Sequence, residues 1–197
     1  MPGVLRRSQL PVDTVELAEF LIGKLLCSRR DAGVTSGRIV ETEAYLPDDA
    51  SSHAFRGRTA RNSAMFLARG FAYVYFIYGT AHCINVVGDR RGVGAAVLIR
   101  ALEPLVGIEL MAQRRGERSP GELARGPGRL AQALGIDRTD DGQDLCARGP
   151  VWLADDGCSP TRIGVGVRIG LTKERDRPLR FFVPGSRFVS GPRALSR

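Results

Sequence analysis

The sequence has few of the side chains that bind metal ions or crosslink a chain. It contains only two histidines, His53 and His82, and four cysteines, none of them in a CxxC spacing. Zinc and iron–sulfur sites need several such side chains at short, regular spacings. We therefore expect no metal and no other cofactor, and we expect the cysteines to be reduced.

Long apolar runs are also missing. No run approaches the ~20 residues that a membrane-spanning helix needs. The opening "MPGVLRRSQLPVDT" has no apolar stretch of the kind found in signal peptides. We expect a cytoplasmic monomer without a membrane partner, associated with the nucleoid if the protein is bacterial.

Acidic residues are absent from one long segment. The chain has 29 Lys and Arg against 21 Asp and Glu, a net charge of +8, yet only two lysines, Lys24 and Lys173. Between residues 50 and 88 there is no Asp or Glu, whereas four arginines fall there: Arg56, Arg58, Arg61 and Arg69. A basic stretch without acids is typical of a surface that binds a polyanion, and nucleic acid is the leading candidate.

The remaining composition is that of one ordinary globular unit. With 197 residues, 43% hydrophobic and 25% charged, the chain is long enough for one well-packed core and short for two. We expect a single α+β domain over residues 1–197. Apolar spacing after Asp13 predicts a helix over 13–26, and Pro104 and Pro127 are placed to begin two more. Strands are predicted at 37–46, 71–79, 95–104, 161–170 and 179–191.

One stretch combines acids with an aromatic ring, and a second holds the remaining tyrosines. In "ETEAYL" the residues Glu41, Glu43 and Tyr45 recur at every second position, and neighbours on one face of a strand are ~6.5 Å apart. The other three tyrosines of the protein follow in "FAYVYFIYG", as Tyr73, Tyr75 and Tyr78. Aromatic rings among basic residues can stack bases while the charges hold phosphates. A glutamate beside them can activate a water against a sugar–base bond, provided that the nucleotide is first flipped out of the duplex.

Longer motifs around these residues closely resemble the alkyladenine, or 3-methyladenine, DNA glycosylase family. They are "GRIVETEAYL", "HAFRGRTARNSAMF", "YVYFIYG", "LIRALEP", "ELARGPGRLAQALGI" and "PLRFFVPGSRFVSG". The motifs are collinear with those of the family, and the match covers nearly the whole chain. The resemblance implies a curved, mostly antiparallel mixed sheet with flanking helices. It also implies a metal-free enzyme that flips damaged purines out of double-stranded DNA and hydrolyses their N-glycosidic bonds. The family's substrates would be 3-methyladenine, 7-methylguanine, hypoxanthine and ethenoadenine.

The resemblance also implies a role for each matched residue. Glu43 matches the general base; Tyr45, His53 and Tyr75 match the residues around the flipped base. Asn85 matches an asparagine that crowds the 2-amino group of guanine, and Arg100 matches an active-site residue near the nucleotide backbone. Tyr78 matches the tyrosine that intercalates into DNA. Arg56, Arg58 and Arg61 are expected to bind phosphates. Thr80 and Ala81 depart from the bulky residues that often follow the intercalating tyrosine.

Other readings of these residues stay open. Glu41 is expected to be structural, His82 a packed histidine, and Tyr73 either a pocket wall or a core residue. Arg100 could instead pair with a carboxylate on a neighbouring strand. A non-catalytic nucleic-acid-binding module would explain the basic, tyrosine-rich surface but has no use for Glu43. A glycosylase that also cuts the backbone would need an amine from Lys24, Lys173 or Pro2; we expect a monofunctional enzyme.

Overall fold

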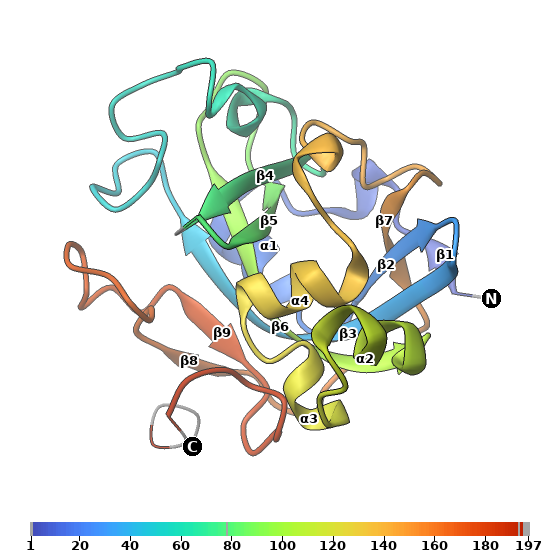
Figure 1. Cartoon of the computed structure of the whole chain (residues 1–197). Helices are drawn as coiled ribbons and strands as arrows, with labels where there is room; N and C mark the ends of the chain where they lie inside the picture. Colours follow the sequence, from blue (N-terminus) through green and yellow to red (C-terminus); the bar gives the residue numbers. More distant parts are fainter. Residues whose placement is uncertain (1, 78, 193, 195–197) are drawn as a thin grey trace.

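One curved antiparallel sheet forms the frame of the molecule (Figure 1). The computed structural model describes residues 2–77, 79–192 and 194. Within them, seven strands follow the order β1-β7-β2-β3-β6-β5-β4, and the hairpin of β8 and β9 joins through β3. The strands are β1 (Gly3–Val4), β2 (Leu25–Arg30), β3 (Gly33–Tyr45), β4 (Ala72–Ile77), β5 (Ala81–Val87), β6 (Ala96–Val106), β7 (Val151–Asp155), β8 (Gly164–Gly166) and β9 (Arg180–Phe182).

In the described part of the chain, four helices flank this sheet: α1 (Thr14–Phe20), α2 (Ile108–Arg115), α3 (Pro120–Leu123) and α4 (Pro127–Leu134). Three 3₁₀ turns accompany them, at Arg7–Gln9, Ser63–Phe66 and Arg138–Asp140. The main core lies where α1 and α4 pack on the sheet, with Leu17 and Leu130 against Ile84 and Ile99. The predicted α+β class with a curved antiparallel sheet is therefore confirmed. No helix in the described ranges is both long and apolar enough to cross a bilayer.

The first predicted helix is shorter than its apolar pattern indicates. The Asp13 carboxylate caps α1 by accepting from the backbone N–H groups of Val15 and Glu16, as its spacing predicts. The helix nevertheless ends at Phe20, and Leu25 begins strand β2. Gly23, with a φ of +89°, turns the chain between them, a conformation that few other residues adopt. The apolar residues after Gly23 thus face the core from a strand, and the prediction of a helix to residue 26 is wrong.

The proline signals were correct for one helix and wrong for another. Pro127 begins α4, and Gly135 ends it with a φ of +67°. Pro104 instead lies within β6, opposite Gly37 of β3. A β-bulge falls at this point, where the ladder between the strands is already irregular and a proline is tolerated. Helix α2 therefore starts only at Ile108, and Gly116 ends it with a φ of +71°.

The pairing of β3 with β6 contains a second irregularity that matters for the site. Thr42 pairs with Ile99 and Glu41 with Ala101, so Arg100 is the extra residue of a bulge on β6. A bulge changes the direction of the extra side chain relative to a regular ladder. It aims the Arg100 guanidinium at the two carboxylates of β3, which hydrogen bonds to both of them confirm.

The C-terminal third contains less strand than its branched and aromatic residues predict. Only Gly164–Gly166 of the predicted strand 161–170 and Arg180–Phe182 of 179–191 are in strands. The two short strands pair with one another, and β9 also pairs with β3 at Glu41, Thr42 and Glu43. The segment between β8 and β9 belongs to no strand. It passes next to Glu43, where it completes the site.

Candidate active site

A cavity of about 340 Å³ opens between the β4–β5 hairpin, the start of α4 and the segment after β8. This volume lies in the range of small-molecule sites. Five of the predicted site residues line the cavity: Tyr45, His53, Tyr75, Asn85 and Arg100. They come from β3, the loop after it, β4, β5 and β6, so the sheet's curvature brings together residues far apart in sequence.

Glu43 lies directly behind this wall and is fully buried. Its Oε1 accepts a hydrogen bond from the backbone N–H of Ile169 at 2.7 Å. Its Oε2 accepts from the Tyr45 hydroxyl at 3.0 Å and from Arg100 Nη1 at 3.1 Å. All three donor residues line the cavity, whereas Glu43 itself does not. The carboxylate is therefore fixed at the cavity wall, and a water must pass these donors to reach it.

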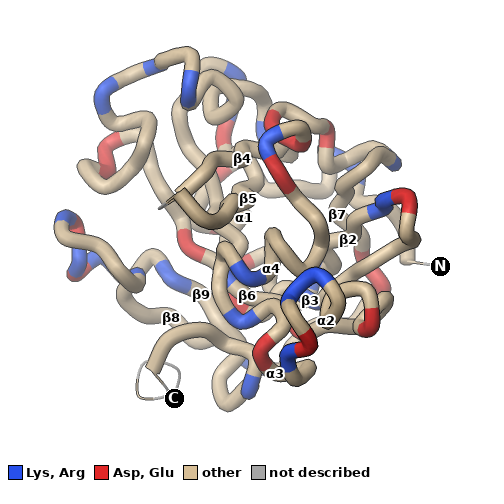
Figure 2. The backbone as a smooth tube through the Cα atoms, in the orientation of Figure 1, with Lys and Arg blue, Asp and Glu red and all other residues tan. Residues whose placement is uncertain are grey.

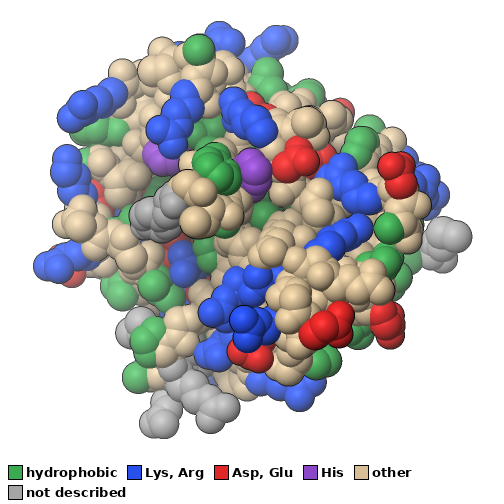
Figure 3. Space-filling view, in the orientation of Figure 1, with side chains coloured by type: hydrophobic (Ala, Val, Ile, Leu, Met, Phe, Trp, Pro, Cys, Tyr) green, Lys and Arg blue, Asp and Glu red, His purple; other side chains and the backbone are tan. Residues whose placement is uncertain are grey.

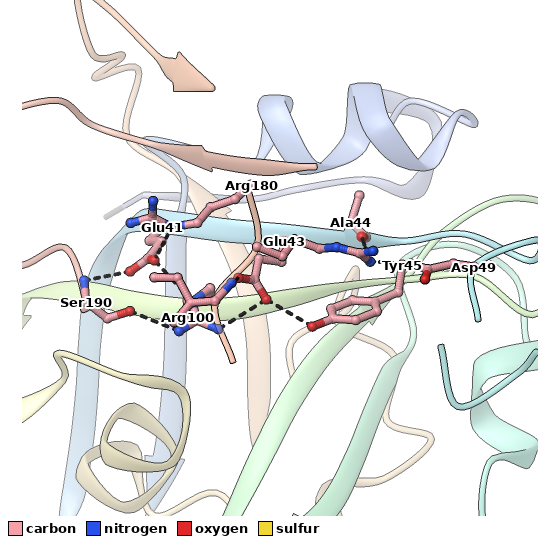
Figure 4. Close-up of polar contacts among 10 residues, drawn as sticks. Glu41, Glu43, Ala44, Tyr45, Asp49, Arg100, Arg180 and Ser190 are labelled. Atoms are coloured by element: carbon pink, nitrogen blue, oxygen red, sulfur yellow. Dashed lines mark hydrogen bonds and ion pairs between the residues drawn. The ribbon is translucent and has the colours of Figure 1, made fainter. Parts of the chain in front are cut away.

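Glu41 belongs to a buried ionic cluster with Glu43 (Figure 4). Its Oε1 accepts from Arg100 Nε at 3.1 Å and from Arg180 Nε at 2.7 Å, and its Oε2 accepts from the Ser190 N–H at 2.6 Å. Arg100 thus bridges the two carboxylates. It both lines the cavity and forms salt bridges with carboxylates on the neighbouring strand, the two alternatives that the sequence left open. Paired carboxylates and guanidiniums balance charge where burial makes an unpaired ion costly. These contacts place Glu41 as a structural support of Arg100.

Burial and charge act on the pKa of Glu43 in opposite directions. Desolvation raises it most strongly and the charge of Glu41 also raises it; the charge of Arg100 and the hydrogen bonds from Ile169 and Tyr45 lower it. The net result is a pKa above the ordinary glutamate value. A carboxylate with a raised pKa is a stronger base when ionised, which is the property that a general base needs.

Three rings form the opposite wall. The centroids of His53 and Tyr75 are 4.6 Å apart with nearly perpendicular planes, and those of Tyr73 and Tyr75 are 5.4 Å apart. His53 Nδ1 is 2.9 Å from the Tyr73 hydroxyl. Tyr73 is almost fully buried but still lines the cavity, so both readings of this residue hold. Burial, aided by the charge of Arg61, lowers the pKa of His53, which is therefore neutral at pH 7.

Asn85 sits in the floor of the cavity on β5. Its side-chain Nδ2 donates to the Tyr73 backbone carbonyl at 3.0 Å, and the residue is 4% exposed. This hydrogen bond fixes the orientation of the side-chain amide. A fixed amide beside the space for a ligand can discriminate between bases by shape and by hydrogen bonding.

The loop between β3 and β4 carries the predicted phosphate-binding arginines. Arg56, Arg58 and Arg61 are all exposed there, and Figure 2 shows this loop with basic positions at its outer end. Asn62 holds the loop from inside: its Nδ2 donates to the carbonyls of His53 and Gly57 at 2.8 and 3.0 Å. In the space-filling view, basic side chains surround the hairpin on this face (Figure 3).

The remaining predictions concern residues at the turn between β4 and β5. The predicted intercalating Tyr78 lies outside the described residues. Ala81 lies close to α4, because a Cβ added at Gly128 would be 2.8 Å from the Ala81 Cβ. His82 is half-buried and its ring is 4.9 Å from that of Phe76, which agrees with a packed histidine.

Several residues of the site carry no signal in the sequence alone. Ile169 acts through its backbone N–H, which any residue but proline could supply. The cavity is also lined by Ser51, Met65, Ile77, Cys83, Pro127, Gly170 and Leu171. Only the folded chain brings residues 169–171 to the cavity and the Ile169 N–H to Glu43. Among the described residues, no three His, Cys, Asp or Glu side chains gather as metal ligands would.

Comparison with known proteins identifies the family. The methylpurine-DNA glycosylase family profile matches residues 8–187. A "Putative 3-methyladenine DNA glycosylase" of Mesorhizobium japonicum is 57% identical over 97% of this chain and 92% of its own length. Proteins with the same name from Paraburkholderia phytofirmans and Methanoculleus marisnigri are 50% and 49% identical, over 97% and 90% of this chain and 90% and 94% of their own lengths. The chain therefore belongs to the methylpurine-DNA glycosylase family of DNA repair enzymes.

Proposed function

We propose that this protein is a monofunctional glycosylase that removes alkylated and deaminated purines from double-stranded DNA. Its substrates would be 3-methyladenine, 7-methylguanine, hypoxanthine and ethenoadenine, and its product an abasic site. The observation that carries the proposal is the buried Glu43, held by three donors at the wall of a base-sized, aromatic cavity. It would act as a single domain and as a monomer.

In this proposal Glu43 takes the proton of a water that attacks the sugar C1′. Arg100 keeps the carboxylate ionised and oriented, since its guanidinium hydrogen-bonds both Glu43 and Glu41. As the glycosidic bond breaks, positive charge develops on the sugar, and the negative Glu43 stabilises it. The leaving base departs more readily when alkylation has already given it a positive charge. An alkylated base leaves as a neutral molecule with the electron pair of the glycosidic bond, whereas hypoxanthine leaves as an anion that takes up a proton from water.

The aromatic wall would hold the flipped base. Tyr45 and Tyr75 offer ring faces, and stacking is worth ~1–3 kcal/mol per base. When the Tyr73 hydroxyl donates to His53 Nδ1, the neutral histidine carries its proton on Nε2 and donates from there. Hypoxanthine presents a carbonyl to such a donor where adenine presents an amine. Asn85 would exclude guanine by crowding its 2-amino group.

The amines needed for backbone cutting lie elsewhere. Lys24 Nζ is paired with Asp155 at 2.7 Å, and Lys173 is exposed and lines no part of the cavity. Pro2 precedes β1, which lies at the opposite end of the strand order from β4. An amine must reach C1′ to form a covalent intermediate, so these positions favour a monofunctional enzyme.

Duplexes that each carry one lesion test the proposal. The protein is incubated with them, and hot alkali then converts any abasic site into a strand break. We expect breaks only after alkali, and a loss of ~10²–10⁴-fold for Glu43→Gln with lesion binding retained. Glu41→Gln should lose much less. Breaks without alkali would refute the monofunctional mechanism; binding without any breaks would leave the nucleic-acid-binding module.

A further inference from the structure

A buried arginine lies against the ring of Tyr45 but outside the cavity. The Arg168 guanidinium is 4.8 Å from the Tyr45 ring centroid, and the residue is 4% exposed. Tyr45 lines the cavity and Arg168 does not, although Ile169, Gly170 and Leu171 beside it do. The arginine therefore covers the ring face that is turned away from the cavity.

The arginine is held there through both terminal nitrogens of its guanidinium group. Its Nη1 donates to the Ala44 carbonyl at 3.0 Å and to the Asp49 carboxylate, and its Nη2 donates to the Glu174 carbonyl at 3.3 Å. The side chains of Arg168 and Asp49 are both fully buried. Asp49 is itself hydrogen-bonded by the N–H and hydroxyl of Ser51, another cavity residue. A cation fixed in this way cannot move aside when a ligand enters.

From this geometry we infer that Arg168 is a specificity-determining residue that lowers the preference of the pocket for positively charged bases. The inference rests on the proposed function, because it concerns the base that Tyr45 would stack. A ring face attracts a cation through its π-electron density. Arg168 already draws on that density from behind, and two cations on opposite faces of one ring repel each other. A cationic 7-methylguanine gains less from Tyr45 than it would from a free tyrosine, whereas neutral hypoxanthine is unaffected.

Tyr75 is the contrasting wall. Its ring neighbours are His53 and Tyr73, which carry no charge at neutral pH, and no cation contacts its face in the described part of the chain. The attraction for a charged base should therefore come mainly from Tyr75. The two tyrosines would differ in selectivity: Tyr45 stacks both kinds of base about equally, and Tyr75 favours the alkylated ones.

The test compares single-turnover excision of 7-methylguanine and hypoxanthine. Arg168 is replaced together with Asp49, as Arg168→Gln/Asp49→Asn, so that neither charge is left buried alone. We expect the ratio of 7-methylguanine to hypoxanthine excision to rise by about 2- to 30-fold, the range of cation–π contacts. An active double variant with an unchanged or lower ratio overturns the inference. A wild-type protein that excises neither base refutes the proposed function instead.

A matched control exists in the same chain. Arg7 lies 4.3 Å from the Phe71 ring centroid and pairs with Asp144 at 2.6 Å, but neither Arg7 nor Phe71 lines the cavity. Arg7→Gln/Asp144→Asn should leave the ratio unchanged. If the Arg168 variant does not fold, Tyr75→Leu in the wild-type background decides the question. It should lower the ratio of 7-methylguanine to hypoxanthine excision several-fold, whereas Tyr45→Leu should leave that ratio nearly unchanged. An equal fall of the ratio in the two variants means that Tyr45 attracts cations and that Arg168 does not weaken it.

Discussion

At the scale of single residues, the site depends on how charges are paired behind the cavity wall. Glu43, Glu41, Arg100 and Arg180 lie in one buried cluster, in which Arg100 is shared by the two carboxylates. The base strength of Glu43 is therefore set partly by Glu41, a residue that would not touch the substrate. This arrangement can be tested through the pH dependence of the reaction.

The pH prediction follows from the raised pKa of Glu43. Glu43 must be ionised to accept a proton, so the excision rate should fall as the pH drops through its pKa. Because burial raises that pKa, the acid limb of the single-turnover rate should lie above the ordinary glutamate value of 4.5. Glu41→Gln removes a negative charge that raises the pKa of Glu43, so its acid limb should move to lower pH. A limb that stays in place would show that Glu41 does not act on Glu43.

Asn85 carries the second residue-scale prediction. Asn85→Ala and Asn85→Ser should gain activity on guanine opposite a mispaired base, relative to hypoxanthine, because they remove the group proposed to crowd the 2-amino position. An unpaired donor costs ~1–3 kcal/mol, which corresponds to roughly 5- to 150-fold. Single-turnover excision of both bases measures the ratio. If the ratio does not change, guanine is excluded elsewhere in the cavity.

At the scale of elements, loops and strand irregularities position the functional groups. The bulge on β6 aims Arg100, the pairing of β9 with β3 brings Ile169 to Glu43, and Asn62 shapes the loop that carries His53 and the exposed arginines. Each of these three arrangements depends on hydrogen bonds of the backbone rather than on apolar packing. Their loss should therefore affect local order more than global stability.

The loop prediction concerns Asn62. Asn62→Ala removes the two donors to the His53 and Gly57 carbonyls, so the segment should open more often. Trypsin should then cut faster after Arg56, Arg58 or Arg61, and DNA binding should weaken. Ser63→Ala is the matched control, because its hydroxyl bonds only the Ala60 carbonyl at the loop's edge. Equal cutting of wild type and Asn62→Ala would contradict this role.

At the scale of the whole molecule, the net charge of +8 is distributed to suit a polyanion. Arg56, Arg58 and Arg61 of the acid-free stretch are exposed on the loop beside the cavity mouth, while Glu41, Glu43 and Asp49 are buried with arginine partners. DNA would therefore meet positive charge, and the negative charges that chemistry requires would be hidden from its phosphates.

Salt dependence tests this distribution. If ~5 phosphates are neutralised, the log–log slope of affinity against salt should be near −4.5, and each arginine that contacts a phosphate should reduce it by about one on replacement. Arg56→Gln, Arg58→Gln and Arg61→Gln are the test variants. Arg29→Gln serves as control, since Arg29 lies on β2 against Trp152, several strands from β4. An affinity that does not respond to salt would remove the argument for a DNA-binding surface.

Most chemical groups of the site, and the kind of protein, can be predicted from the order of the amino acids. The alternation of Glu41, Glu43 and Tyr45 predicts one strand face, and the Tyr45 hydroxyl indeed reaches Glu43. Periodicity and charge are local properties, so they predicted α4, the strands that carry the tyrosines, and the exposed arginines. Helix 13–26 failed because its apolar pattern continues past Gly23, where the backbone turns and the core is reached from β2 instead.

How these groups act together depends on contacts that form only when the chain folds. The backbone N–H of Ile169 and the guanidinium of Arg168 reach Glu43 and Tyr45 from more than a hundred residues away. A bulge directs Arg100 to two carboxylates at once, and no pattern in "LIRALEP" encodes that direction. Periodicity tells which face of a strand a side chain occupies, but pairing across the sheet decides its neighbours. The pKa of Glu43 and the electrostatics of the Tyr45 ring depend on those neighbours, and so they exist only in the folded chain.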